Sequence, residues 1–433
     1  MGWLLWGTAP VGYAISQPGQ ALHDACAKGD AREVGRLLEA GADPNLPISG
    51  RACCYSVNEW PINTATTQGD VGIVRMLLDH GAKIDKPDSE GLKPIHLAAQ
   101  SGNLEMVKLL LSRGAGIHSP SGYSKSTETP LESACISGDL AMVKYLVAQG
   151  ASPAKSADCL SCAARSQKQE VVLFLLEHGA RISASGESPV VAATDKGDLA
   201  MVKLLVKHGA ALNAKEKDGW SSIHTASRSG NAELVAYLLD HGANANLPIQ
   251  SKQTDYSQNG YRPLHFAANG AVTKLLLDHG AEVNRQAKDG KTPLHLAKDP
   301  ESVQLLLDHG ARVDLRDGAK QQPLHSLASE YGTKPESIRA LLRHGASLDT
   351  TDYDDKTALD EAAFWGRTEA AQTLIECGAR PTAVTMEAAI RSKSLPIVLL
   401  LVSHGVEVPA DARAQWPELA KKLTPLKRSR PEK

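Results

Sequence analysis

Short apolar stretches with a helical period alternate with polar, glycine-rich segments along almost the whole chain. Leu104, Val107, Leu110 and Leu111 are spaced so that a helix would gather them on one face. A shorter stretch, Pro-Ile-His-Leu-Ala-Ala at residues 94–99, precedes them, and Pro is favoured at the first position of a helix. The pattern predicts pairs of short helices joined by tight turns.

A Gly-Ala pair closes the second helix of each predicted pair, since glycine readily adopts the left-handed conformation that ends a helix. Eleven copies and a degenerate twelfth, Gly405-Val406, recur at a mean interval of about 33 residues, the mark of a repeat array. The copies begin at Gly41, Gly81, Gly114, Gly150, Gly179, Gly209, Gly242, Gly280, Gly310, Gly345, Gly378 and Gly405. We therefore expect one elongated domain over residues 19–410.

The openings of the first helices carry a family resemblance. Arg262-Pro263-Leu264-His265, Thr292-Pro293-Leu294-His295 and Gln322-Pro323-Leu324-His325, together with the Gly-Ala close, resemble the ankyrin repeat family over about residues 20–408. The resemblance implies an all-α repeat solenoid, an ankyrin array of helix–turn–helix units with β-hairpin fingers. It also implies binding of another protein through the fingers and the inner helices.

The two ends of the chain differ from the array. Residues 1–18 form an uncharged, mostly apolar segment, which we interpret as an apolar extension or as an export leader that lacks the usual basic start. Residues 411–433 form a basic tail, which a frayed terminus or a nuclear-targeting segment would both explain. A cytoplasmic location is the main expectation, and an exported or periplasmic one applies if residues 1–16 are a signal segment.

Composition excludes several classes of protein. Lys plus Arg total 47 against 49 for Asp plus Glu, which argues against a nucleic-acid binder that works by bulk charge. No run of 18 apolar residues occurs, so no membrane span is expected. Seven scattered cysteines do not suggest a disulfide framework. Only 4% of the residues are aromatic, as suits a core of thin Leu/Ala helices.

Fourteen of the fifteen histidines recur at two fixed places of the repeat, so we expect structural roles for them. One set lies in the first helix and should bond the neighbouring turn; the other precedes the closing Gly, where a ring N–H can meet free carbonyls. Cys159 and Cys162 have the spacing of half a zinc motif without a second pair, and packing is the favoured interpretation. With no phosphate loop, zinc-protease or nucleophile motif, we expect no enzyme, no catalytic residues, no metal and no cofactor.

Two fingers are longer than the rest, and both begin with Asn-Leu-Pro-Ile, at residues 45–48 and 246–249. The scarce aromatic residues gather in these and other turns, and Tyr and Trp on presented loops favour protein contact. The alternative is that they pack between adjacent fingers and stiffen the array. The predicted partner-binding residues are Tyr55, Trp60, Tyr123, Trp220, Tyr256, Tyr261, Tyr353 and Trp365.

The predicted function is a non-enzymatic scaffold that binds a partner protein through these aromatic residues and the concave helix face. The alternative is an inhibitor or immunity-type protein that occludes a partner enzyme. We expect a monomer that does not bind nucleic acid and does not span a membrane. The sequence does not identify the partner.

Overall fold

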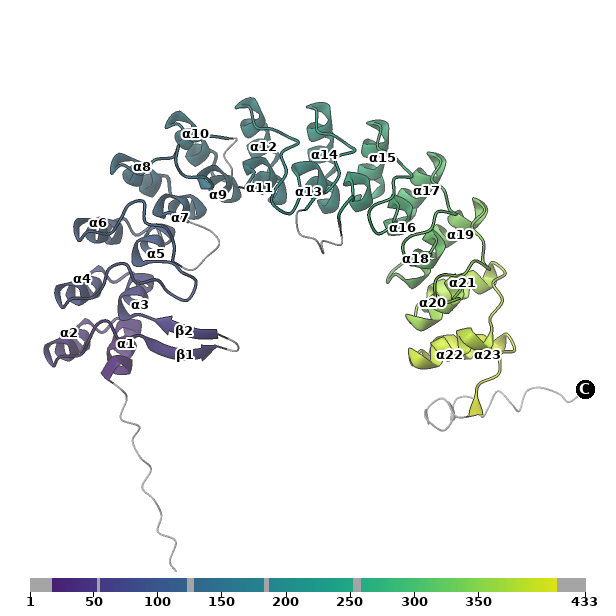
Figure 1. The fold of residues 1–433 in the computed structure, drawn as a ribbon, viewed down its shortest axis with the longest axis horizontal. Helices are drawn as coiled ribbons and strands as arrows, with labels where there is room; N and C mark the ends of the chain where they lie inside the picture. Colours follow the sequence, from purple (N-terminus) through teal and green to yellow (C-terminus); the bar gives the residue numbers. More distant parts are fainter. Residues whose placement is uncertain (1–17, 53–54, 123–127, 183–186, 252–257, 411–433) are drawn as a thin grey trace, which may run out of the picture. The chain divides into compact units, whose positions relative to one another are not determined.

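The computed structural model describes residues 18–52, 55–122, 128–182, 187–251 and 258–410. Pairs of short antiparallel helices follow one another along this part of the chain (Figure 1). The pairs confirm the prediction of an all-α repeat solenoid.

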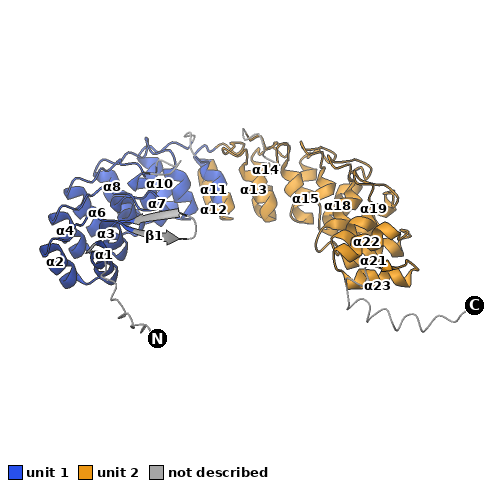
Figure 2. Cartoon of the chain, turned by 60° about the horizontal axis from the view of Figure 1, so that its bottom comes forward, with its two compact units in different colours: residues 1–193, 207–210 blue, residues 194–206, 211–433 orange. Residues whose placement is uncertain are grey.

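The contacts divide the chain into two compact units, residues 1–193 with 207–210 and residues 194–206 with 211–433 (Figure 2). The helices of unit 1 are α1 (Pro18–Lys28), α2 (Ala31–Glu39), α3 (Pro61–Gln68), α4 (Val71–Asp79), α5 (Pro94–Gln100), α6 (Leu104–Ser112), α7 (Pro130–Ser137), α8 (Leu140–Ala148), α9 (Cys159–Arg165) and α10 (Gln169–Glu177). The division falls within α11 (Pro189–Asp195) and α12 (Leu199–Lys207).

Unit 2 continues the same alternation of first and second helices. Its helices are α13 (Ser222–Ser229), α14 (Ala232–Asp240), the 3₁₀ helix η1 (Pro263–Phe266), α15 (Gly270–Asp278), α16 (Pro293–Leu296), α17 (Pro300–Asp308), α18 (Pro323–Ser329), α19 (Pro335–Arg343), α20 (Ala358–Phe364), α21 (Thr368–Glu376), α22 (Ala383–Arg391) and α23 (Leu395–Ser403). First helices contact first helices, as α16, α18, α20 and α22 do, and second helices α15, α17, α19, α21 and α23 form the other layer.

Helix α6 shows why these sequences fold as they do. The side chain of Asn103 accepts a hydrogen bond from the Met106 N–H at 3.0 Å and so caps the start of the helix. Met106, Val107 and Leu110 are fully buried on one face. Gly114 has a φ of 94°, which ends the helix in the left-handed region as the Gly-Ala rule predicts.

The first long finger is a β-hairpin in which β1 (Ile48–Ala52) pairs antiparallel with β2 (Tyr55–Glu59). Other described fingers close with a single turn, as where the Asp88 N–H donates to the Leu92 carbonyl at 2.9 Å. Among the described fingers, only the first is therefore the two-stranded β-hairpin that the resemblance implies. In the second long finger, Ile249 N–H donates to the Tyr261 carbonyl at 2.7 Å and closes the base.

An asparagine that follows the Gly-Ala pair links each of several repeats to the next. Asn284 donates from Nδ2 to the Gly310 carbonyl at 2.9 Å and accepts through Oδ1 from the Arg312 N–H at 2.8 Å. Asn45 and Asn246 make the same two bonds to the repeats that follow them. The Asn shared by the two long fingers is therefore explained by a bond between repeats.

We expect Asn284→Ala to lower the free energy of unfolding by about 1–2 kcal/mol, because it removes two bonds between adjacent repeats. Asn284→Asp keeps the acceptor for Arg312 N–H and loses only the donor, so its loss should be smaller. Urea unfolding followed by circular dichroism measures both. Equal stability of wild type and Asn284→Ala would show that this link contributes nothing.

The prediction is confirmed for five of the six first-helix histidines and for seven of the eight that precede a closing Gly. In five first helices the ring Nε2 donates to a carbonyl of the next finger at 2.8–3.2 Å: His96, His224, His265, His295 and His325. His23 differs, since its Nε2 lies 2.7 Å from the Thr64 hydroxyl. Seven histidines of the second set reach the carbonyl four residues earlier at 2.7–2.9 Å: His80, His178, His241, His279, His309, His344 and His404.

Candidate functional site

The exposed aromatic side chains of the described residues come from two neighbouring repeats of unit 2. Tyr331 is 81% exposed, Tyr353 72% and Trp365 53%. Tyr331 follows α18 and Trp365 follows α20, whereas Tyr353 lies in the finger before α20. Because α18 and α20 pack side by side, Tyr331 and Trp365 lie at the same ends of two adjacent first helices, and Tyr353 lies at the other end of α20. We call these three residues the aromatic patch.

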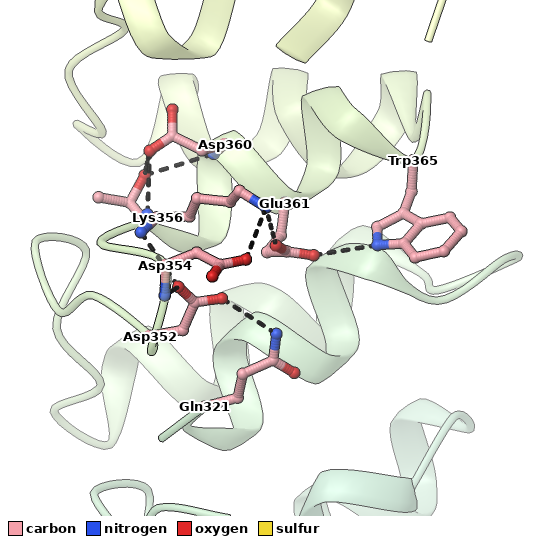
Figure 3. A network of polar contacts seen from close by, with 8 residues as sticks. Gln321, Asp352, Asp354, Lys356, Asp360, Glu361 and Trp365 are labelled. Atoms are coloured by element: carbon pink, nitrogen blue, oxygen red, sulfur yellow. Dashed lines mark hydrogen bonds and ion pairs between the residues drawn. The ribbon is translucent and has the colours of Figure 1, made fainter. Parts of the chain in front are cut away.

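Trp365 is held by a hydrogen bond to a buried carboxylate. Its Nε1 donates to Glu361 Oε2 at 3.0 Å, and its ring meets that of Phe364 edge to face, with centroids 5.3 Å apart. Glu361 itself is only 6% exposed. Figure 3 shows the Glu361 carboxylate between Trp365 and the ammonium of Lys356, which lies 3.7 Å from Oε1. The indole therefore has a preferred orientation before any partner binds.

Lys356 links this carboxylate to the preceding finger. Its Nζ lies 3.2 Å from Asp354 Oδ2 and 4.8 Å from the centroid of the Phe364 ring. Burial opposes the charged form, but the hydrogen bond to Asp354 and the charges of Glu361, Asp354 and Asp352 together raise the pKa of Lys356. Lys356 stays charged at neutral pH and fixes the approach of the finger to α20.

Buried Asp352 organises the finger itself. Its Oδ1 accepts from the N–H groups of Asp354 and Lys356, at 2.9 and 3.1 Å, and its Oδ2 accepts from Gln321 Nε2 at 3.2 Å (Figure 3). The N–H of Tyr353 donates to the Ala319 carbonyl at 3.0 Å. The turn that carries Tyr353 is thus bonded both within itself and to the preceding finger.

Cations lie against the two tyrosine rings of the patch. The Arg367 guanidinium is 5.3 Å from the Tyr331 ring centroid, and Lys320 Nζ is 5.2 Å from that of Tyr353. Arg367 also donates from Nε to the Ser329 carbonyl at 2.8 Å. Such contacts restrict the exposed rings and reduce the entropy that they would lose on binding.

The sequence prediction missed Tyr331 because it considered the fingers and the end of one first helix. Tyr331 lies instead in the turn between the helices of a pair, immediately before Gly332. A large aromatic residue in a turn that other repeats fill with Gly-Asn or Gly-Asp was the signal that could have found it.

Two of the predicted contact residues are buried. Trp220 is 6% exposed and Tyr261 8%, and they form an apolar cluster with Ile249 and Ala287. The Trp220 ring lies 4.7 Å from that of Phe266, and the Tyr261 hydroxyl donates to Asp289 Oδ2 at 2.8 Å. Their positions match the alternative interpretation, in which aromatic residues pack between adjacent fingers.

Trp60 is half-buried and also contacts the next finger. Its Nε1 donates to the Pro87 carbonyl at 2.9 Å, and Lys86 Nζ lies 4.4 Å from the ring centroid. Tyr123 and Tyr256 lie outside the described residues, and of Tyr55 only the backbone pairing with Ala52 is described. Of the predicted set, Tyr353 and Trp365 are thus the residues placed with exposed rings.

The four described cysteines of unit 1 are buried, as the packing interpretation requires. Cys26, Cys135, Cys159 and Cys162 are all free thiols. Burial raises the pKa of Cys26 and of Cys159 to about 12, so neither is a ready nucleophile at neutral pH. Cys53 and Cys54 lie outside the described residues.

Two further kinds of feature are absent from the described residues. No group of three or more His, Cys, Asp or Glu side chains there is arranged to hold a metal ion. Nor does that part of the chain contain a helix long and apolar enough to cross a membrane.

Curated relatives match parts of the chain. The B-cell lymphoma 3 protein homolog of Mus musculus is 44% identical over 92 residues, 20% of this chain and 20% of that protein. Human diacylglycerol kinase iota is 35% identical over 111 residues, 25% of this chain and 10% of the kinase. This chain thus spans only a tenth to a fifth of the length of these two relatives.

A solved structure and a family description match as well. The ankyrin repeat domain of human ASB11 is 25% identical, covers 51% of this chain and 99% of its own length, and has a TM-score of 0.40. The description "Ankyrin repeats (3 copies)" matches residues 22–121, 118–185, 163–249, 247–317 and 297–385. Since this family description matches most of the sequence, the chain belongs to the ankyrin repeat family.

Proposed function

We propose that this protein is a non-enzymatic scaffold that binds a partner protein through the aromatic patch of unit 2. Ankyrin repeats generally mediate protein–protein interactions. The observation that supports this site is the concentration of exposed aromatic rings beside α18 and α20, each placed by polar contacts. Rigid aromatic side chains bury a large area at low entropic cost, which makes them frequent anchors of interfaces.

The approach to the patch includes both signs of charge. Arg367 and Lys320 lie against the tyrosines, and the exposed carboxylates of Asp354 and Asp355 flank Tyr353. A partner that covers the rings would meet a polar rim around apolar anchors, the usual composition of a protein interface. We propose that the protein binds in this way as a monomer.

The triple variant Tyr331→Ala, Tyr353→Ala and Trp365→Ala should no longer bind the partner. Affinity purification with quantitative mass spectrometry, run in parallel on wild type and the triple variant, identifies proteins that only the intact patch retains. For the purified partner we expect the dissociation constant to rise by at least about 100-fold, since each aromatic anchor typically contributes 1 kcal/mol or more.

Ile136→Ala with Leu173→Ala is the matched control, because these side chains are exposed apolar residues of unit 1. Circular dichroism spectra should show both variants folded, with melting temperatures lowered to a similar small extent. Retention of the same partner at equal affinity by the triple variant would contradict the patch as the binding site.

A further inference from the structure

Unit 1 contains a recess whose lining includes none of the residues of the aromatic patch. It is a pocket of about 390 Å³ between α3, α5 and the finger turn at residues 88–92. Helices α3 and α5 pack side by side (Figure 1). Thr64, Thr67, Gln68, Leu97 and Gln100 form its helical wall, so most of that wall offers hydroxyl and amide groups. Its size is within the range of pockets that bind ligands or side chains.

The charged groups of this pocket are all acidic. Glu59, Asp88 and Glu90 line it, and no Lys or Arg is among the lining residues. Asp88 Oδ1 accepts from the N–H groups of Glu90 and Leu92, at 2.9 and 2.8 Å, so this oxygen holds the turn. Glu90 is exposed and forms no ion pair with the described residues. Three carboxylates therefore line one recess, and none of the described lining residues is a Lys or Arg.

Neighbouring basic residues are engaged elsewhere. Lys86 Nζ lies 4.4 Å from the Trp60 ring centroid, and Lys93 Nζ donates to Ser119 Oγ at 2.6 Å. His23 Nε2 lies 3.6 Å from Glu59 Oε2. Burial lowers the pKa of His23, so at neutral pH it is uncharged and does not cancel the charge of Glu59.

Asn63 supplies an independent sign that a donor belongs here. It lines the pocket, is only 3% exposed, and its Oδ1 has no hydrogen-bond partner. Its Nδ2 donates to the Lys86 carbonyl at 3.1 Å, which fixes the orientation of the amide. Oδ1 itself is buried, so a ligand N–H reaches it only if the amide turns toward the pocket; that bond would recover the free energy that an unsatisfied buried acceptor costs.

We infer that this pocket binds an arginine side chain of a partner protein. A guanidinium carries five N–H donors in one plane, which suits carboxylates at the rim and neutral acceptors along the wall. A lysine ammonium has three donors at a single point and satisfies fewer of these groups. The inference rests on the proposed function in that the arginine belongs to a bound protein, but it concerns a different unit and different residues.

The test uses the full chain with ¹³C-labelled threonine methyl groups and the probe peptide acetyl-Gly-Arg-Gly-amide. Titration should shift the methyl resonances of Thr64 and Thr67 saturably and leave that of buried Thr66 less affected. The citrulline peptide, which is isosteric and uncharged, should not bind, and the lysine peptide should bind at least about fivefold more weakly.

Two sets of variants test the pocket directly. The double variant Glu59→Gln with Glu90→Gln removes two charges without changing shape. It should weaken binding of the arginine peptide about tenfold or more. Thr67→Lys places a cation in the pocket from an exposed position and should abolish binding. Glu105→Gln, an exposed acid of α6 outside the pocket, should leave the affinity unchanged.

The inference is overturned if the arginine peptide does not bind, if citrulline or lysine binds equally well, or if the double Gln variant binds as wild type does. The triple variant of the aromatic patch should bind the probe normally. If the triple variant keeps its partner while the arginine peptide still binds, the proposed site in unit 2 is refuted and this pocket is not. If the triple variant loses its partner while the arginine peptide does not bind, the pocket is refuted and the proposed site is not.

Discussion

Trp220→Ala should lower the free energy of unfolding by about 3–5 kcal/mol, as large-to-small changes of buried aromatic residues do. The ring is 6% exposed, packs 4.7 Å from Phe266 and lies under the guanidinium of Arg228, 4.4 Å from the ring centroid. With Ile249, Tyr261 and Ala287 it connects three successive fingers of unit 2. Its removal leaves a cavity, and the four-residue helix η1 has few side chains that could move to fill it.

Urea unfolding followed by circular dichroism measures this loss, and Tyr353→Ala is the matched control. Tyr353 is also a finger aromatic residue but is 72% exposed, so its truncation should change stability by no more than about 0.5 kcal/mol. If the two variants were equally stable, Trp220 would not have the packing role that its burial assigns to it. The pair thus separates packing from partner contact in the predicted aromatic set.

Mild acid should destabilise the protein through the buried histidines of the first helices. Burial lowers the pKa of His224 and of His265 to about 4, from an ordinary value of 6.5. In both rings Nε2 donates to the next finger, and Nδ1 faces a donor at Ser221 or Arg262, so the neutral form is the one that fits. Protonation therefore favours the unfolded chain.

The sign and the pH range follow from these pKa values. The contribution of neutral His224 and His265 to the free energy of unfolding is complete above pH 6.5. It is lost as pH falls from 6.5 towards 4, because the unfolded state binds more protons over that range. At pH 5.5 the two histidines together should cost about 3 kcal/mol, at 1.36 kcal/mol per pKa unit for each. His96, His295 and His325, whose pKa values burial also lowers, act in the same direction.

Unfolding measured between pH 7.5 and pH 5 checks this expectation. His265→Asn should reduce the pH dependence, because Asn63 occupies the corresponding place in α3 and donates to the next finger without titrating. His309→Asn, at an exposed position after α17, controls for loss of an imidazole. A slope unchanged by His265→Asn would show that this ring does not control the acid response.

Much of the architecture follows from local sequence alone. Asn103 and Met106 to Leu110 specify a capped amphipathic helix, and Gly114 ends it, because each requirement is met within one turn of the chain. The recurrence of the histidines at two register positions was likewise enough to assign the hydrogen bonds of most of them, His23 being an exception. The closing glycine repeats twelve times, so errors in one repeat do not change the fold that the sequence predicts.

The surface depends on contacts between repeats, which the sequence does not display. Trp220 and Tyr353 both lie in finger turns, yet only the neighbouring Ile249, Tyr261 and Phe266 bury the first and leave the second exposed. Composition had marked the rare aromatic residues as informative without separating these two classes. Sequence by itself determined the repeat, its period and its caps, because these are local; tertiary structure decided which rings face solvent, because burial depends on the residues of the adjacent repeats.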